Sequence, residues 1–207
     1  MIVNDRYRFV FVHIPKTAGT SIQTALGEVD GLNKRPTRKA GTKHETPTEL
    51  MARLELTPDA LMPSRNSDIK VADYLFFCFV RNPWARFCSL HRYVLALNQE
   101  RGREHVPEDV NNFAALLDQR DPWIMQLHSI RPQTDFVTEQ VTSIGRYENL
   151  AEDFAGIMAK LGLTLELPHK NKSGYNQEDY RQLLSPASAE IIAGFYAEDA
   201  RVLGYEF

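Results

Sequence analysis

The chain has 207 residues, of which 43% are hydrophobic and 25% charged, with a formal net charge of −3. This length and composition are typical of one globular domain over residues 1–207 and exclude a disordered chain. The slightly negative charge argues against a general nucleic-acid-binding protein. The longest apolar run, Tyr74 to Val80, is far shorter than the roughly 18 residues of a membrane span, and no apolar leader is visible near the N-terminus.

The sequence contains two cysteines, Cys78 and Cys88, and both lie among apolar residues. Two cysteines exclude a disulfide scaffold and a four-cysteine zinc site. We expect two buried thiols that pair with nothing, which fits a reducing, cytoplasmic compartment.

Two segments, Arg8–Ile14 and Tyr74–Val80, are almost continuously apolar and rich in aromatic and β-branched residues. This pattern predicts strands that are buried on both faces, as in a parallel sheet covered by helices. A third strand is expected at Thr142–Arg146. Helical patterns alternate with these strands and predict an α/β fold with a mostly parallel sheet. The expected helices are Thr20–Leu26, Thr46–Leu54, Pro83–Leu97, Asn112–Gln119, Leu150–Leu161 and Pro186–Tyr196.

The segment after the first strand reads H-I-P-K-T-A-G-T-S, from His13 to Ser21. A strand, a tight turn and a helix that starts at small hydroxyl residues form an anion site, because the N–H groups of the first helical turn point at the ligand. Lys16 adds a positive charge. The segment is not a Walker A loop, since Lys16 precedes the glycine instead of following it and no aspartate ends a strand to hold magnesium.

A second basic segment, V-R-N-P-W-A-R-F-C-S, follows the second strand. Arg81 stands at the carboxyl end of that strand, where open α/β sheets bind ligands. Arg81 and Ser89 can converge on a second phosphate through guanidinium and hydroxyl donors. Arg86 either assists them or forms a structural ion pair. Two phosphate sites predict a ligand that has two phosphate groups.

At this point the chain resembles the sulfotransferases that use 3′-phosphoadenosine 5′-phosphosulfate (PAPS), in the branch of the carbohydrate sulfotransferases and their bacterial relatives. Pro15–Ser21 matches the 5′-phosphosulfate motif of that branch, and R-N-P-x-x-R-x-x-S from Arg81 to Ser89 matches its 3′-phosphate motif. Three further elements occur in the same order: Gly145–Leu150, Asn171–Ser173 and the pattern from Asp199 to Phe207.

The resemblance implies a P-loop-NTPase-like, three-layer fold and transfer of a sulfuryl group from PAPS, without a metal, leaving 3′-phosphoadenosine 5′-phosphate (PAP). Lys16 would stabilise the departing phosphate, and Arg81 and Ser89 would hold the 3′-phosphate. Lys172 and Ser173 would close over the nucleotide. The 5′-phosphate would be held by Lys16, Thr17, Ala18, Gly19, Thr20 and Ser21.

A hydroxyl acceptor requires a general base. We select His44, because bacterial relatives often have a lysine–histidine pair at this place, and keep Glu45 and His128 as alternatives. His13 is expected to be a packing residue at the strand end. The basic segment Lys34–Lys43 is a solvated face, a lid, or a contact for an acidic acceptor.

The acceptor is expected to be a carbohydrate, a glycolipid or a small metabolite, reacting at a hydroxyl or an amine. Two other functions stay open. An atypical P-loop kinase would require magnesium. A module that binds PAP without turnover would lack a working base.

Overall fold

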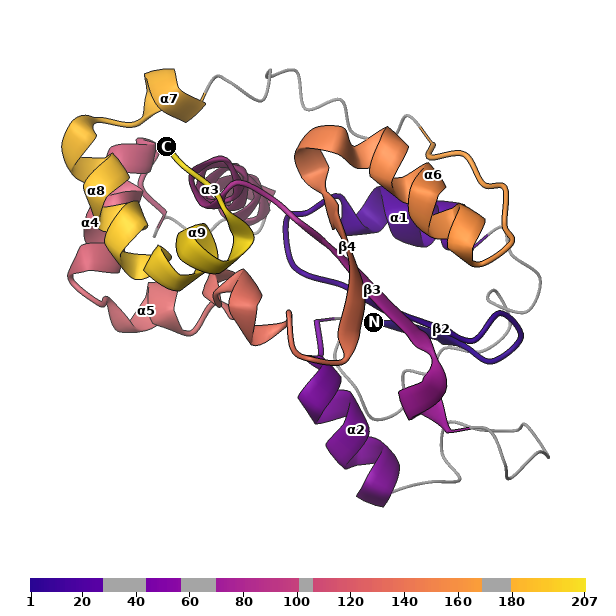
Figure 1. The fold of residues 1–207 in the computed structure, drawn as a ribbon. Helices are drawn as coiled ribbons and strands as arrows, with labels where there is room; N and C mark the ends of the chain where they lie inside the picture. The colour runs from indigo at the N-terminus through magenta and orange to yellow at the C-terminus, as the bar shows by residue number, and fades with distance from the viewer. Residues whose placement is uncertain (28–43, 57–69, 101–105, 169–179) are drawn as a thin grey trace. The chain divides into compact units, whose positions relative to one another are not determined.

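The computed structural model describes residues 1–27, 44–56, 70–100, 106–168 and 180–207 (Figure 1). The chain forms two compact units. Unit 1 comprises Met1–Val80 and Asp135–Asn171, and unit 2 comprises Arg81–Thr134 and Lys172–Phe207. Each unit is therefore assembled from two separate stretches of chain. A single domain over residues 1–207 stays a prediction.

Unit 1 is built on a four-stranded sheet with the strand order β1-β2-β3-β4. β2 and β3 pair in parallel, as do β3 and β4, while β1 pairs antiparallel with β2. The predicted α/β fold with a mostly parallel sheet is thereby confirmed. The bounds are β1 (Ile2–Asn4), β2 (Phe9–Val12), β3 (Leu75–Val80) and β4 (Val141–Arg146).

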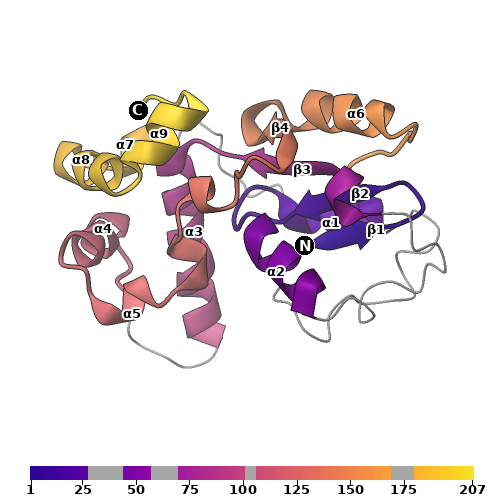
Figure 2. The ribbon, with the colours of Figure 1, turned by 60° about the horizontal axis from the view of Figure 1, so that its bottom comes forward.

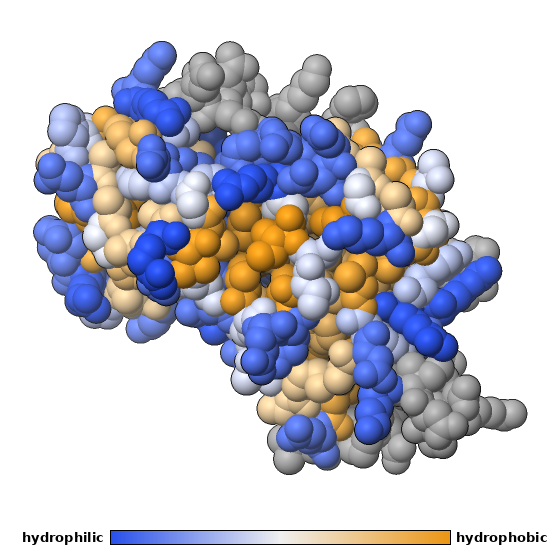
Figure 3. Space-filling model, viewed as in Figure 1, coloured by the Kyte–Doolittle hydropathy of each residue, from blue (hydrophilic) through white to orange (hydrophobic). Residues whose placement is uncertain are grey.

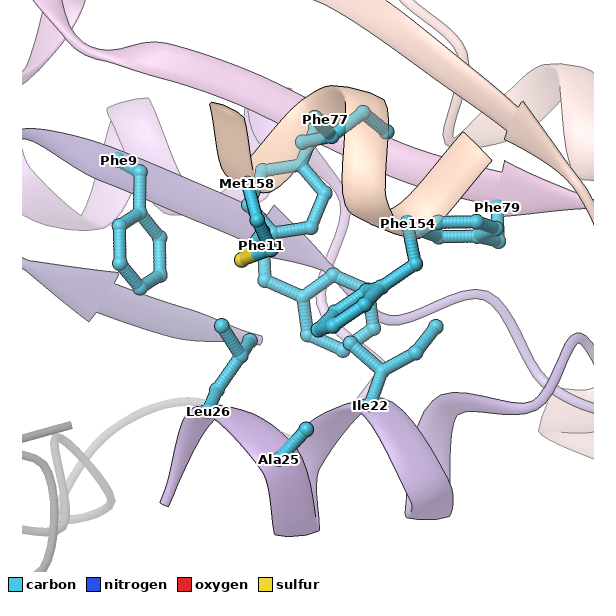
Figure 4. Close-up of a cluster of buried hydrophobic side chains, with 10 residues drawn as sticks. Phe9, Phe11, Ile22, Ala25, Leu26, Phe77, Phe79, Phe154 and Met158 are labelled. Carbon is cyan, nitrogen blue, oxygen red and sulfur yellow. The ribbon is translucent and has the colours of Figure 1, made fainter. Parts of the chain in front are cut away.

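One face of this sheet is covered by α1 (Gly19–Leu26) and α6 (Leu150–Lys160) (Figure 1). Phenylalanines at alternate positions of β2 and β3 point to this face, since side chains alternate along a strand. The helices meet them with apolar residues at helical spacing, as Figure 4 shows. The cluster consists of Phe9, Phe11, Phe77 and Phe79 from the strands, Ile22, Ala25 and Leu26 from α1, and Phe154, Ile157 and Met158 from α6.

In its described residues, unit 2 consists of helices joined by turns and short irregular segments. Its longest helix, α3, packs against α4, α7 and α8 (Figure 2). The bounds are α3 (Pro83–Glu100), α4 (Val110–Asp118), α5 (Pro122–Met125), the single turn η3 (His128–Ile130), α7 (Tyr180–Leu183), α8 (Pro186–Phe195) and α9 (Ala197–Leu203). A further single turn, η4 (Gln133–Asp135), lies where the chain passes back to unit 1.

The predicted helices are all present, and the differences lie at their ends. α4 begins before the predicted Asn112 because the Asp109 carboxylate accepts a hydrogen bond from Asn111 N, which caps the helix there. α2 (Pro47–Leu56) and α3 extend beyond their predicted ends. The short elements β1, α5, α7 and α9 were not predicted.

Among the described residues, no helix combines the length and apolar character that crossing a membrane requires. In the surface view of Figure 3, hydrophilic residues border hydrophobic ones over the outer helices of unit 2.

Cys78 on β3 and Cys88 on α3 are both buried and form no disulfide, which confirms the prediction. Burial raises the pKa of Cys78 to about 12 and that of Cys88 to about 11, although the charges of Arg92 and Arg81 partly oppose the second shift.

We therefore expect both thiols to resist a thiol reagent such as 5,5′-dithiobis(2-nitrobenzoate) at pH 8. The thiolate fraction of Cys88 would be roughly one in a thousand at that pH, and the reagent cannot reach either sulfur. The measurement is the absorbance released with and without guanidinium chloride. Rapid reaction of one equivalent in the folded protein would contradict the buried position of that cysteine.

Candidate functional site

The first candidate site is the loop that joins β2 to α1 in unit 1. Helix α1 begins at Gly19, and no side chain caps its first turn. The first turn also lacks an acidic residue. The partial positive charge of the helix N-terminus is therefore not offset locally, which favours an anionic ligand.

The loop backbone is strained at two positions that are not glycine. Lys16 and Ala18 both have left-handed conformations, with φ of 69° and 67°. Each costs about 1 kcal/mol relative to an ordinary conformation. The Thr17 hydroxyl, between them, donates to the Ile14 carbonyl at 3.0 Å and fixes the turn. Because that proton is used within the loop, Thr17 would reach a phosphate through its backbone N–H.

Gly19 is required for space. The buried ring of His13, which stacks on Phe11, lies directly below it. A Cβ atom at Gly19 would lie 1.8 Å from His13 Nε2, far inside van der Waals contact. The His13 ring thus supports the start of α1, and any side chain at position 19 would displace one of them.

His44 contacts the same strand end. Its Nδ1 lies 2.9 Å from the His13 carbonyl oxygen, and the two rings meet edge to face with centroids 4.5 Å apart. A carbonyl oxygen can only accept a hydrogen bond, so Nδ1 of His44 carries the proton. In the neutral imidazole the basic lone pair is then on Nε2, the arrangement that a general base needs.

The residue after His44 is fixed by an ion pair. Arg53 donates to both carboxylate oxygens of Glu45, at 2.7 and 2.6 Å. The side chains are 13% and 7% exposed, respectively, so water competes little for them. The hydrogen bond to Glu45 also raises the pKa of Arg53. Both carboxylate oxygens of Glu45 are thus occupied by Arg53, which favours His44 over Glu45 as the base.

A capping box holds the start of α2 immediately beyond this ion pair. Thr46 N donates to the Glu49 carboxylate at 2.8 Å, and Glu49 N donates to the Thr46 hydroxyl at 3.1 Å. The chain that follows His44 is therefore fixed by two adjacent sets of side-chain hydrogen bonds.

The second candidate site is the start of α3 in unit 2. Arg81, directly after β3, is buried, and Ser89 on α3 is half-buried. The Asn82 side chain caps α3, accepting from Trp84 N at 3.1 Å and Ala85 N at 3.2 Å. Its amide nitrogen donates to the Glu206 carbonyl at 3.0 Å and so attaches the C-terminal segment to the same turn.

Arg86 has internal partners. It is 2% exposed, donates to the Arg131 carbonyl, and stacks over the Tyr196 ring with its guanidinium carbon 5.2 Å from the centroid. These contacts favour a structural role for Arg86, one of the two roles that its place in the motif allowed. The charges of Arg92 and Arg81 both act on the thiol of Cys88, the residue before Ser89, and oppose the rise of its pKa.

Of the predicted residues not yet placed, His128 is described by the structure and the others are not. His128 is exposed at the start of η3. Another histidine, His91, was not predicted as a site residue; it is buried on α3, where its Nε2 donates to the Pro107 carbonyl at 2.8 Å, and burial lowers its pKa. Lys172, Ser173 and the basic segment Lys34–Lys43 lie outside the described residues.

Sequence reasoning missed three residues that support the candidate sites: the buried Gln133 and Asp199, and the partly buried Arg53. Asp199 was visible as the first residue of the C-terminal motif, but no local pattern distinguishes Gln133 or Arg53. Across the residues that the structure describes, no group of three or more His, Cys, Asp or Glu side chains could hold a metal ion.

Comparison with known proteins gives three matches. The model of the sulfotransferase family matches residues 1–206. An uncharacterized protein of Archaeoglobus fulgidus is 34% identical over 118 residues, which cover 54% of this chain and 86% of that protein. A crystal structure of a sulfotransferase from Alicyclobacillus acidocaldarius aligns with 97% of this chain and 96% of its own, at 14% identity and a TM-score of 0.48.

Replacing Gly19 by Ala should destabilise the protein by about 2 kcal/mol, because the added methyl group overlaps the His13 ring. The measurement is urea unfolding of the single variant and of the double variant with His13→Ala. If the overlap is with His13, the double variant loses less than the sum of the two single changes.

The matched control is Gly156→Ala on α6, where an added Cβ meets nothing within 4 Å. It should stabilise the protein by roughly 0.5–1 kcal/mol, because glycine is a poor helix former. A Gly19→Ala variant as stable as this control would contradict the close approach of His13.

Proposed function

The chain belongs to the sulfotransferase family, and on that premise we propose that it transfers a sulfuryl group from PAPS to a hydroxyl or amine of a carbohydrate, a glycolipid or a small metabolite. Two observations carry the proposal. The start of α1, three residues after Lys16, has no side-chain cap, and the tautomer of His44 suits a general base.

The donor fits the residues of the loop. A helix start that has neither a side-chain cap nor an acidic neighbour suits the 5′-phosphate, and the hydroxyls of Thr20 and Ser21 add donors. Lys16 supplies a positive charge for the oxygen on which negative charge develops as the sulfuryl group leaves. Charge stabilisation and alignment of this kind account for most of the rate in such transfers.

Arg81 and Ser89 would bind the 3′-phosphate of the donor. Arginine presents several donors in a planar fork that matches phosphate geometry. We further propose that Lys172 and Ser173 close over the nucleotide. When bound, PAPS supplies the sulfuryl group, whose bond to the 5′-phosphate oxygen breaks while a bond to the acceptor forms.

His44 would accept the proton of the acceptor at Nε2. Its Nδ1–H, held by the His13 carbonyl, fixes the ring orientation before the acceptor binds. The Glu45–Arg53 ion pair fixes the neighbouring backbone. A general base must lie within hydrogen-bond reach of the proton that it takes, and a ring already held in one orientation suits that requirement.

Donor binding is tested by the thermal shift of the protein with PAP, PAPS, AMP and ATP–magnesium. A ligand at 100 times its dissociation constant adds about 2.7 kcal/mol of stability, which is a shift of several degrees. We expect stabilisation by PAP and PAPS, a much smaller effect of AMP, and loss of that difference in Arg81→Ala.

The control for Arg81→Ala is Arg201→Ala, which removes the same charge from an exposed position of unit 2. It should respond to PAP as the unchanged protein does. Stabilisation by ATP–magnesium alone would overturn the proposal in favour of a kinase.

The base is tested with His44→Ala, for which we expect turnover to fall by at least a hundredfold, since general base catalysis contributes roughly 10²–10⁴. PAP affinity should stay unchanged. The measurement is PAP release over an acceptor panel, beside isothermal titration with PAP.

His128→Ala is the comparison, because His128 is exposed and was the other histidine considered. Turnover that survives in His44→Ala and disappears in His128→Ala would reverse the assignment. PAP binding without turnover on any acceptor would favour a binding module.

A further inference from the structure

A single buried side chain fixes the backbone of Arg81. Nε2 of Gln133 donates to the Arg81 carbonyl at 2.8 Å, and Oε1 accepts from Arg81 N at 2.8 Å. Because a primary amide carries both a donor and an acceptor, Gln133 satisfies both backbone groups, as a neighbouring strand would. The hydrogen-bonded pairing of β3 with β4 ends at Val80. At the next residue, Arg81, the Gln133 side chain takes the place of a neighbouring strand.

The orientation of the Gln133 amide is dictated by Asp199, which is fully buried. Asp199 Oδ2 accepts from Gln133 N at 2.8 Å and from its Nε2 at 3.4 Å. Rotating the amide by half a turn would place Oε1 against the carboxylate, which is repulsive. Asp199 Oδ1 accepts from the backbone and hydroxyl of Thr134, both at 2.9 Å, so four donors replace the lost hydration of this charge.

Two further side chains, from α3 and from the residue after α8, hold the segment 130–134. The Tyr196 hydroxyl donates to the Ile130 carbonyl at 2.8 Å, and Arg86 donates to the Arg131 carbonyl. Arg86 and Tyr196 also stack on each other. Arg86 thus acts on the same segment as Asp199, which explains an arginine at this place of the motif without any contact to a ligand.

We propose that Gln133 and Asp199 are positioning residues for recognition of the 3′-phosphate. They fix the Arg81 backbone so that its long side chain starts from one defined position, because a small displacement of a charged donor weakens a bidentate contact. The preference for a nucleotide with a 3′-phosphate then depends on Gln133, which contacts Arg81 through its backbone alone. The inference rests on the proposed function, in which Arg81 binds that phosphate.

A purely structural role predicts a different result. A network that only stabilises the fold would, when broken, weaken PAP and AMP binding equally. A network that positions Arg81 would weaken PAP binding and leave AMP binding unchanged, because AMP lacks the 3′-phosphate.

The experiment is isothermal titration of the full chain with PAP and with AMP, for Gln133→Met, Arg81→Ala and the double variant. We expect Gln133→Met to reduce the ratio of PAP to AMP affinity about tenfold, the scale of a weakened hydrogen bond to a charged group. In the Arg81→Ala background the same change should have no further effect on the ratio.

Two controls separate position from stability. Gln119→Met makes the same chemical change at an exposed glutamine of unit 2 and should leave both affinities unchanged. Thr134→Val removes one hydrogen bond of Asp199 but keeps both bonds between Gln133 and Arg81, so the ratio should be preserved. A ratio lowered as much by Thr134→Val as by Gln133→Met would overturn the inference.

The remaining outcomes are equally decisive. Equal affinity of the unchanged protein for PAP and AMP would refute the two-phosphate site of the proposed function. A normal preference for PAP, lost in Arg81→Ala and retained in Gln133→Met, would refute the inference alone. If Gln133→Met does not fold, Asp199→Asn replaces it, because this change keeps Gln133 but lets its amide rotate, and the same loss of preference is expected.

Discussion

The parallel pairing of β2 with β3 is the constraint on which the candidate sites depend. Val12 pairs with Cys78 in a parallel register, so the carboxyl ends of β2 and β3 lie at the same edge of the unit 1 sheet. The segment after β2 becomes the anion loop, and the residue bonded to the end of β3 is Arg81. A shift of either strand by one residue would turn its phenylalanines away from α1 and α6, so packing of this cluster fixes the register and with it the end of each strand.

The anion loop shows that a glycine and a left-handed backbone need not coincide. The loop contains one glycine, Gly19, and glycine is the residue expected to have a positive φ in such a turn. Instead Lys16 and Ala18 have the positive φ angles, and Gly19 provides room for the His13 ring. Strain of this kind persists where the surrounding structure imposes it, here through the Thr17 hydrogen bond and the buried His13.

The elements that the sequence predicted are those with strong local signals. A window of a few residues is enough to recognise the apolar runs of β2 and β3 and the periodic apolar residues of α1 and α6. β1 escaped prediction because it has only three residues, one of them polar, and its position depends on pairing with β2. Gln133 escaped because its partners, Arg81 and Asp199, are 52 and 66 residues away in the chain.

Several charged groups in the described part of the chain are withdrawn from solvent and hydrogen-bonded beside the candidate sites. Replacing a buried ion pair by apolar residues is often neutral or stabilising, so Glu45–Arg53 is not explained by stability alone. The Asp199 carboxylate and the Arg86 guanidinium are also buried, and each is hydrogen-bonded to the segment 131–134. What these groups share is position: the first stands beside His44, and the other two hold the segment that carries Gln133. Hydrogen bonds to charges are directional, whereas apolar packing is not, and a site that must hold phosphates and a base in fixed places needs the directional kind.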